Sequence, residues 1–206
     1  MKTLFDFVLH LDVHLAALVA QFGWLTYGIL FLIAFCETGL VFTPFLPGDS
    51  LIFVAATLAG QGMLHVSILW VSFTIASVLG DGVNYWVGTR FGARLEKSKM
   101  IKKEHLEKTQ FFYEKYGKKT IIIARFIPVV RTFAPFVAGM ARMNYRDFLV
   151  YNIVGGIAWV SFFTFTGFFF GQIPWVQDNL EKVILGIIVL SLIPPAIEIW
   201  KQWKRS

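Results

Sequence analysis

The chain is poor in the residues that build disulfide-rich, metal-binding or highly charged soluble proteins. It contains one cysteine, Cys36, so no disulfide can form within the chain. Its four histidines and single cysteine show no metal-ligand spacing, which predicts neither a metal site nor a cofactor. A secretory signal peptide is not expected, because Asp6 and Asp12 interrupt the first apolar run and only Lys2 precedes it.

Charge is scarce as well, and apolar residues are abundant. Only 16% of the 206 residues are charged, whereas an ordinary soluble domain has about 25%. Hydrophobic residues make up 56%, including 22 Phe and 7 Trp. A soluble domain of this size could not bury so many apolar side chains, so the surplus must face lipid. The composition predicts an integral membrane protein.

The basic residues are concentrated between apolar segments. The net charge is +6, and ten of the 19 Lys and Arg residues fall within residues 90–119. A nucleic-acid-binding domain would spread its basic residues over a folded face with aromatic residues among them. Basic residues placed between apolar runs are typical of membrane-protein loops. Nucleic acid is therefore not an expected partner.

The apolar segments have two lengths. A helix that crosses a membrane needs about 20 residues. Residues 66–89, 148–171 and 183–200 satisfy this requirement and are predicted to be transmembrane helices. Residues 1–22 are predicted to form an N-terminal helix, and its crossing of the membrane is left open.

Two other apolar segments are broken by glycine and proline. Residues 23–60 and 120–143 each contain two short apolar runs, and residues 90–119 form a basic connector between the two units. Irregular backbone at membrane depth is tolerated where protein or a water-filled cavity covers it. Both segments are therefore predicted to be re-entrant helical hairpins. The residues expected to shape their turns are Pro47, Gly48, Pro128 and Pro135.

An internal repeat relates the two halves. A shift of 79 positions places residues 59–60 on 138–139, Gly88 on Gly167, and residues 91–92 on 170–171. One crossing separates the two hairpins, so the second unit is predicted to be inverted relative to the first. Inverted repeats with broken helices are an architecture of many transporters. The predicted fold is a single all-α membrane domain with this repeat.

The loop charges predict the orientation. In this topology residues 90–119, the turn at 142–146 and the C-terminal tail lie on one side, and all three are basic. Cytoplasmic loops carry the excess of Lys and Arg. The C-terminus is therefore predicted to be cytoplasmic.

Four charged residues fall inside the broken segments: Glu37, Asp49, Arg125 and Arg131. Each would cost about 2.5–3.5 kcal/mol at a helix centre on insertion scales, so they must be paired or hydrated. They could form two ion pairs that hold the hairpins together. They could also line a substrate and proton site, because an arginine fork suits phosphate and a carboxylate in an apolar pocket can carry a proton. Both interpretations can hold together.

Three weaker features have structural alternatives. Asp81 and Asn84 share one helix face, and either hydrogen-bond to a hairpin or belong to a polar pathway. Trp159 is expected to serve packing or interface anchoring more than ligand contact, and Cys36 is expected to be inert packing.

The broken segments carry motifs that resemble those of the DedA family. The motifs are FCETG at 35–39, FLPGDS at 45–50, GDGVNY at 80–85, ARFIPVVRT at 124–132 and PFVAGM at 135–140. The resemblance covers nearly the whole chain and implies membership of the wider VTT-domain group, which includes lipid flippases and scramblases. It implies that Glu37 and Asp49 couple protons and that Arg125 and Arg131 bind substrate.

The function expected from this resemblance is that of a lipid-phosphate flippase linked to the proton-motive force. Undecaprenyl phosphate, returned from the outer to the inner leaflet of a bacterial inner membrane, is the expected substrate. The alternatives are a flippase for phosphatidylethanolamine or other phospholipids, an uncoupled scramblase, and an ion-driven transporter of a small solute. An enzyme is not expected, since no histidine lies in the broken segments to serve as a base. Expected partners are membrane lipids and protons, with a homo-oligomer possible.

Overall fold

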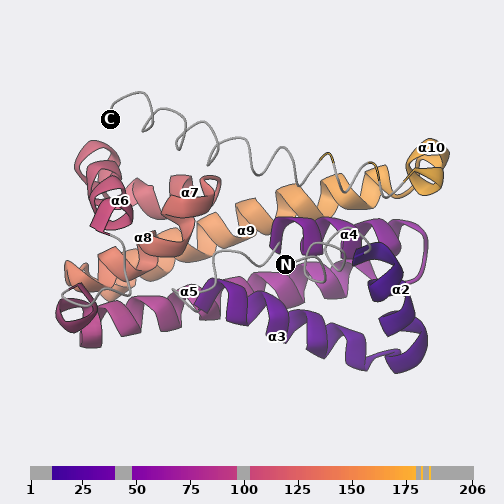
Figure 1. The fold of residues 1–206 in the computed structure, drawn as a ribbon, viewed down its shortest axis with the longest axis horizontal. Helices are drawn as coiled ribbons and strands as arrows, with labels where there is room; N and C mark the ends of the chain where they lie inside the picture. The colour runs from indigo at the N-terminus through magenta and orange to yellow at the C-terminus, as the bar shows by residue number, and fades with distance from the viewer. Residues whose placement is uncertain (1–10, 40–47, 97–102, 180–181, 183–185, 187–206) are drawn as a thin grey trace. The chain divides into compact units, whose positions relative to one another are not determined.

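The computed structural model describes residues 11–39, 48–96, 103–179, 182 and 186. Every element in these ranges is a helix (Figure 1), so the all-helical prediction is confirmed for this part of the chain. The helices are α2 (Leu11–Phe22), α3 (Leu25–Gly39), α4 (Gly48–Gly60), α5 (Val66–Glu96), α6 (Lys103–Tyr116), η1 (Gly117–Lys119), α7 (Thr120–Ala124), α8 (Pro128–Met140), α9 (Tyr145–Phe170) and α10 (Pro174–Asp178).

Helices α5 and α9 are the two described helices that are long and apolar enough to cross a membrane. The candidate spans are Val66–Gly92 and Tyr145–Phe170. Only 33% of the most apolar stretch of each span is buried inside the protein. Most of their apolar side chains therefore remain available to lipid, as expected for transmembrane helices.

The remaining topology predictions are not tested by these helices. The predicted third crossing at residues 183–200 lies outside the described residues except for Gly186, and residues 1–10 of the N-terminal helix lie outside them too. The re-entrant hairpins, the inverted repeat and the basic connector at 90–119 stay predictions. Helix α5 continues to Glu96, seven residues beyond the predicted end of the first crossing at 89.

The chain divides into two compact units. The first contains Met1–Phe31, Pro47–Phe73 and Val160–Ser206, and the second contains Leu32–Leu46 and Thr74–Trp159. Helices α3, α5 and α9 each contribute residues to both units. Each unit has its own packing, which is described separately below.

In the first unit, helix α4 is buried along almost its whole length and packs against α9 through glycines. Gly60 of α4 lies against the backbone of Phe168 and Gly171, where an added Cβ would be 3.2 Å from the Gly171 Cα atom. The Thr57 hydroxyl donates a hydrogen bond to the Gly167 carbonyl at 3.2 Å. Glycine is needed at these positions because the backbones of two helices approach closely.

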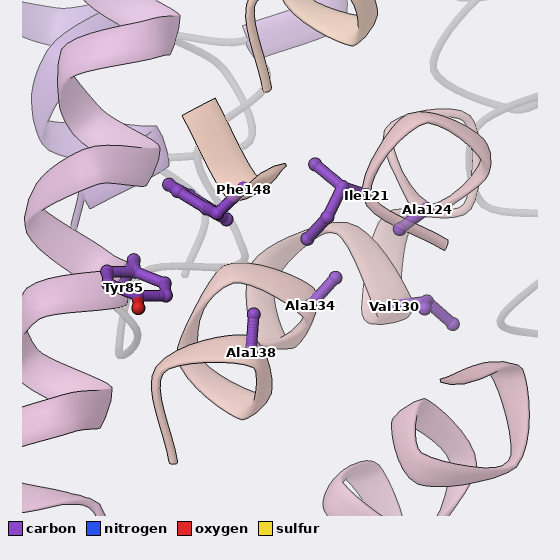
Figure 2. Close-up of a cluster of buried hydrophobic side chains, with 7 residues drawn as sticks. All are labelled: Tyr85, Ile121, Ala124, Val130, Ala134, Ala138 and Phe148. Carbon is purple, nitrogen blue, oxygen red and sulfur yellow. The ribbon is translucent and has the colours of Figure 1, made fainter. Parts of the chain in front are cut away.

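In the second unit, helix α8 packs against α5 in a related way. Gly88 of α5 lies against the backbone of Phe136, and Gly139 of α8 lies against the backbone of Tyr85 and Thr89. Tyr85 also stacks on Phe148 of α9 with ring centroids 4.4 Å apart. Figure 2 shows the apolar cluster that joins these helices to α7, formed by Tyr85, Ile121, Ala124, Val130, Ala134, Ala138 and Phe148.

A proline explains why α7 and α8 are separate helices. Ile127 has an extended backbone, as the residue before a proline commonly does, and Pro128 opens α8 at its first turn. Pro128 therefore shapes the break in the second broken segment. Pro135, in contrast, lies inside α8 and not at a turn. Because its ring nitrogen carries no hydrogen, Pro135 cannot donate the helical hydrogen bond to the carbonyl four residues earlier.

The close contact at Gly88 gives a testable prediction. We expect Gly88→Ala to lower the free energy of unfolding by about 1–3 kcal/mol, because the new methyl group would overlap the Phe136 backbone. Gly82→Ala on the same helix is the control, since nothing lies within 4 Å of its added Cβ. It should stabilise by about 0.5–1 kcal/mol through helix propensity. Thermal unfolding in detergent measures both, and equal effects would contradict the packing described here.

Candidate functional site

Within the described part of the second unit, two ion pairs have a buried carboxylate, and the first of them joins α3 to α8. Arg131 Nη2 donates a hydrogen bond to Glu37 Oε1 at 2.9 Å. The Glu37 side chain is 5% exposed, whereas that of Arg131 is 15% exposed. The pair therefore brings together one predicted proton-coupling residue and one predicted substrate-binding residue, and the arginine is its more accessible member.

Each charge of this pair lies near a helix end at which the helix dipole has the same sign as that charge. Glu37 is in the last turn of α3, which ends at Gly39, and Arg131 follows the first turn of α8, which begins at Pro128. A carboxylate is disfavoured near the negative C-terminal end of a helix, and a cation is disfavoured near the positive N-terminal end. The two charges therefore depend on each other for compensation.

The Arg131 guanidinium also contacts an aromatic ring. Its Cζ atom lies 5.0 Å from the ring centroid of Trp159 in α9, and Trp159 is 2% exposed. A guanidinium over an indole face gains a cation–π attraction, which is stronger when water is excluded. Trp159 was expected to serve packing or interface anchoring, and it additionally holds the arginine in place.

The second ion pair is more deeply buried. Arg125 lies in the turn between α7 and α8, and its Nη2 atom is 2.5 Å from Asp81 Oδ2 of α5. The two side chains are 2% and 5% exposed. The same guanidinium nitrogen donates to the side-chain oxygen of Asn152 in α9. Asp81, predicted either to hydrogen-bond to a hairpin or to belong to a polar pathway, is thus a direct partner of Arg125.

Glycines of α9 make room for this arginine. Gly155 and Gly156 follow Asn152 by three and four residues and so lie on the same helix face. An added Cβ at Gly155 would be 3.1 Å from both the Cδ and Nε atoms of Arg125. Asn152 is fixed in turn, because its Nδ2 atom donates to the Val78 carbonyl at 3.0 Å. Arg125 is held between α5 and α9.

Asn84 contacts both broken segments. Its Nδ2 atom donates to the Thr132 carbonyl at 2.9 Å and to the Thr38 carbonyl at 3.5 Å. Thr38 follows Glu37, and Thr132 follows Arg131. Of the two roles considered for Asp81 and Asn84, hydrogen bonding to the segments at 23–60 and 120–143 is therefore present in the structure.

The other predicted site residues have different placements. Asp49 is in the first turn of α4 and belongs to the first unit, and Gly48 is the first residue of that helix. Pro47 lies outside the described residues. Cys36 is exposed, so the expectation that it is packed inside the protein is wrong. Among the residues that the structure describes, no group of three His, Cys, Asp or Glu could hold a metal ion.

Sequence reasoning missed Asn152 and the contact of Trp159 with Arg131. Asn152 is the single amide in the uncharged run at 148–170, and its spacing to Gly155 and Trp159 follows one helix face. That spacing is a signal that the sequence carries. The partner of Asn152 could not be identified, however, because the fold decides which helix faces it.

A tyrosine and a lysine outside the spans have shifted acidity. Burial, and then the negative charge of Asp81, raise the pKa of Tyr113 in α6, so its hydroxyl stays protonated. That hydroxyl donates to the Ala134 carbonyl of α8 at 2.9 Å. Lys118 is exposed, and the hydrogen bond and charge of Asp147 raise its pKa. Helix α6 is therefore tied to the helix that carries Arg131.

Two helices that are long and apolar enough to cross a membrane, with paired charges buried beside them, fit a helical integral membrane protein. The VTT domain family model matches residues 46–169. The chain belongs to this family, that of the DedA membrane proteins.

Several relatives agree with this assignment. The chain is 58% identical to Protein DedA of Escherichia coli strain K12, over 98% of this chain and 94% of the relative. It is 43% identical to an uncharacterized membrane protein of Mycobacterium leprae, over 84% of this chain and 79% of the relative. It is 29% identical to the inner membrane protein YghB of E. coli K12, over 91% of this chain and 84% of the relative. No solved structure matches.

Proposed function

We propose that this protein is a flippase that moves the phosphate headgroup of a membrane lipid across the bacterial inner membrane, with transport linked to the proton gradient. Undecaprenyl phosphate is the expected substrate. The observation that carries the proposal is the Arg131–Glu37 pair, in which a partly accessible arginine of a membrane protein contacts the Glu37 carboxylate and the Trp159 ring. A lipid phosphate could replace that carboxylate as the partner of Arg131.

A phosphate would suit this position for two physical reasons. The planar guanidinium can bind two phosphate oxygens at once, while its stem remains packed in the protein. Arg131 also lies near the beginning of α8, where the helix dipole favours an anion. An incoming phosphate would gain from both, and Glu37 would be released from the arginine.

The two arginines would then have different roles, although the sequence assigned substrate binding to both. Arg125 is 2% exposed and already bound to Asp81 and Asn152. Displacing it would leave Asp81 buried and unpaired, which is strongly unfavourable. Arg131 is therefore the proposed headgroup contact, and Arg125 positions the turn that leads to it.

Proton coupling would act through the carboxylates. Protonation of Glu37 would remove the negative charge that holds Arg131 and would make the arginine available to phosphate. Asp49 stands as the second proposed proton-coupling residue, placed in the first turn of α4. The direction of the proton gradient would then bias the direction of transport.

Transport would also require the two repeat units to move in alternation, and two pairs of contacts support the repeat itself. In the first unit, Thr57 contacts Gly167 and Gly60 contacts Phe168. In the second unit, Phe136 contacts Gly88 and Gly139 contacts Thr89. Adding 79 to the α4 residues gives the α8 residues, and subtracting 79 from the α9 residues gives the α5 residues. The same helix–helix packing therefore recurs at the repeat distance.

The proposed location is the bacterial inner membrane, with the C-terminus in the cytoplasm. The relative YghB is named an inner membrane protein, and the basic residues at 90–119 favour a cytoplasmic position for that connector.

Reconstituted vesicles would test the proposal. We expect headgroup translocation of undecaprenyl phosphate to depend on an imposed proton gradient, and phosphatidylethanolamine to move much more slowly. The measurement follows the accessibility of each labelled headgroup to a membrane-impermeant reagent. Equal movement of both lipids without a gradient would contradict the proposal and indicate a scramblase. Hydrolysis of the lipid phosphate would indicate an enzyme instead.

A further inference from the structure

Three residues of α5 form a continuous stripe that contacts the helices carrying Glu37 and Arg131. Gly80, Asn84 and Gly88 are spaced by four residues, so they lie on one helix face. An added Cβ at Gly80 would be 2.9 Å from the Thr38 Cβ and 3.0 Å from the Gly39 nitrogen. At Gly88 it would be 2.9 Å from the Phe136 carbonyl carbon. The end of α3 and the middle of α8 thus rest directly on α5.

Asn84 stands between these two contacts and bonds to both helices. Its two amide protons point to the carbonyls of Thr38 and Thr132, the residues that follow Glu37 and Arg131. The Thr38 carbonyl is one of the last in α3 and has no donor within that helix. Asn84 is 0% exposed, and among the described residues its Oδ1 atom has no hydrogen-bond partner. A buried, unpaired acceptor is unfavourable, and such atoms in native proteins call for an explanation.

We infer that Asn84 is a positioning residue that acts as a latch, holding α3 and α8 together so that Glu37 occupies Arg131 until a phosphate headgroup displaces it. This inference rests on the proposed function. It assigns to Asn84 control over how readily the binding site opens. The Asn84 amide donates to the two backbone carbonyls, so its effect on the pair is exerted through them.

A latch has a consequence that simple structural damage does not have. If the binding-competent state is rarely populated, the apparent Kd is the intrinsic Kd divided by the populated fraction. Loss of the latch increases that fraction, so Asn84→Leu should bind a phosphate headgroup about tenfold more tightly, the change produced by about 1.4 kcal/mol. Turnover should fall in the same variant, because Glu37 no longer returns efficiently to Arg131 to release the headgroup.

Direct binding to the purified full-length chain provides the first test, with farnesyl phosphate and inorganic phosphate as separate probes. Ser77→Ala is the matched control, because Ser77 is a buried polar residue of α5 whose hydroxyl donates to the Thr74 carbonyl of its own helix at 3.2 Å. It should bind like the wild type. Asn84→Gln keeps the amide donor and should restore part of the wild-type affinity and turnover.

Weaker binding by Asn84→Leu would overturn the inference, since it is the result expected from structural damage alone. The same tenfold ratio with inorganic phosphate would support the latch equally and would assign free phosphate as the ligand. If Asn84→Leu fails to fold, the smaller perturbation in Asn84→Gln decides the sign of the affinity change.

Amide hydrogen exchange separates failure of the latch from failure of the proposed function, because it needs no ligand. Exchange at residues 32–39 and 128–136 should be faster in the Asn84 variants and unchanged in Ser77→Ala. If the wild type binds neither probe, the proposed function is wrong. Hydrogen exchange alone then decides whether Asn84 holds α3 and α8 together. Unchanged exchange in both Asn84 variants would overturn the latch whatever the binding result.

Discussion

Arg131→Ala is expected to abolish gradient-dependent translocation of a lipid phosphate. A hydrogen bond to a charged group contributes about 1.5–3 kcal/mol, which corresponds to a loss of about 10–100-fold for one contact. A bidentate contact at a partly buried site should exceed this range. Arg131→Lys should retain only a small part of the activity, since an ammonium group cannot reproduce the planar fork or its contact with Trp159.

The difficulty in interpreting Arg131→Ala is that it also leaves the Glu37 carboxylate buried without its partner. A protein that fails to fold would likewise show no transport. The double variant Arg131→Ala with Glu37→Gln removes that orphaned charge, and its thermal unfolding temperature should return toward that of the wild type. Transport should remain absent in this stable double variant. Recovery of transport would show that Arg131 serves only to neutralise Glu37, and would contradict its role in substrate binding.

Several features of this site could be predicted from the sequence, because they follow from the free-energy cost of charges in apolar segments and from the spacing of residues along a helix. Four charges in apolar segments had to be paired or hydrated, and Glu37 and Arg131 are indeed paired. The period of 3.6 residues placed Asp81 and Asn84 on one face of α5. Membership of the family was evident from the five motifs and is confirmed by the VTT domain match.

The partner of Arg125 could not be predicted in the same way. Counting charges in the broken segments suggested that Glu37 and Asp49 balance the two arginines. Asp81, which lies in a continuous helix, was therefore expected either to hydrogen-bond to a hairpin or to belong to a polar pathway. Its role depends on α5 and the turn after α7 lying side by side, and no local pattern specifies that packing. Pro135 is a second case in which local sequence was not enough. It was expected to shape a turn, but it lies inside α8, because packing by neighbouring helices can keep a proline within a helix.

Arg125→Ala is expected to have the largest effect on stability of any single substitution in the second unit. Removing one partner of a buried ion pair costs about 3–5 kcal/mol, because the remaining charge is left without compensation. Asp81→Ala should have a similar effect, since the two side chains are 2% and 5% exposed and each is the charged partner of the other. Chemical or thermal unfolding in detergent would measure both losses.

A neutral replacement of both partners separates stability from transport at this second pair. Arg125→Met with Asp81→Leu removes both charges and keeps apolar volume, and buried pairs replaced in this way are often as stable as the original. If Arg125 only positions the turn before α8, this double variant should unfold close to the wild type and regain a measurable part of the transport that Arg125→Ala loses. A stable double variant that neither binds nor moves a lipid phosphate would instead place Arg125 at the headgroup beside Arg131. The division of labour between the two arginines would then be wrong, and both would contact the substrate as the sequence first suggested.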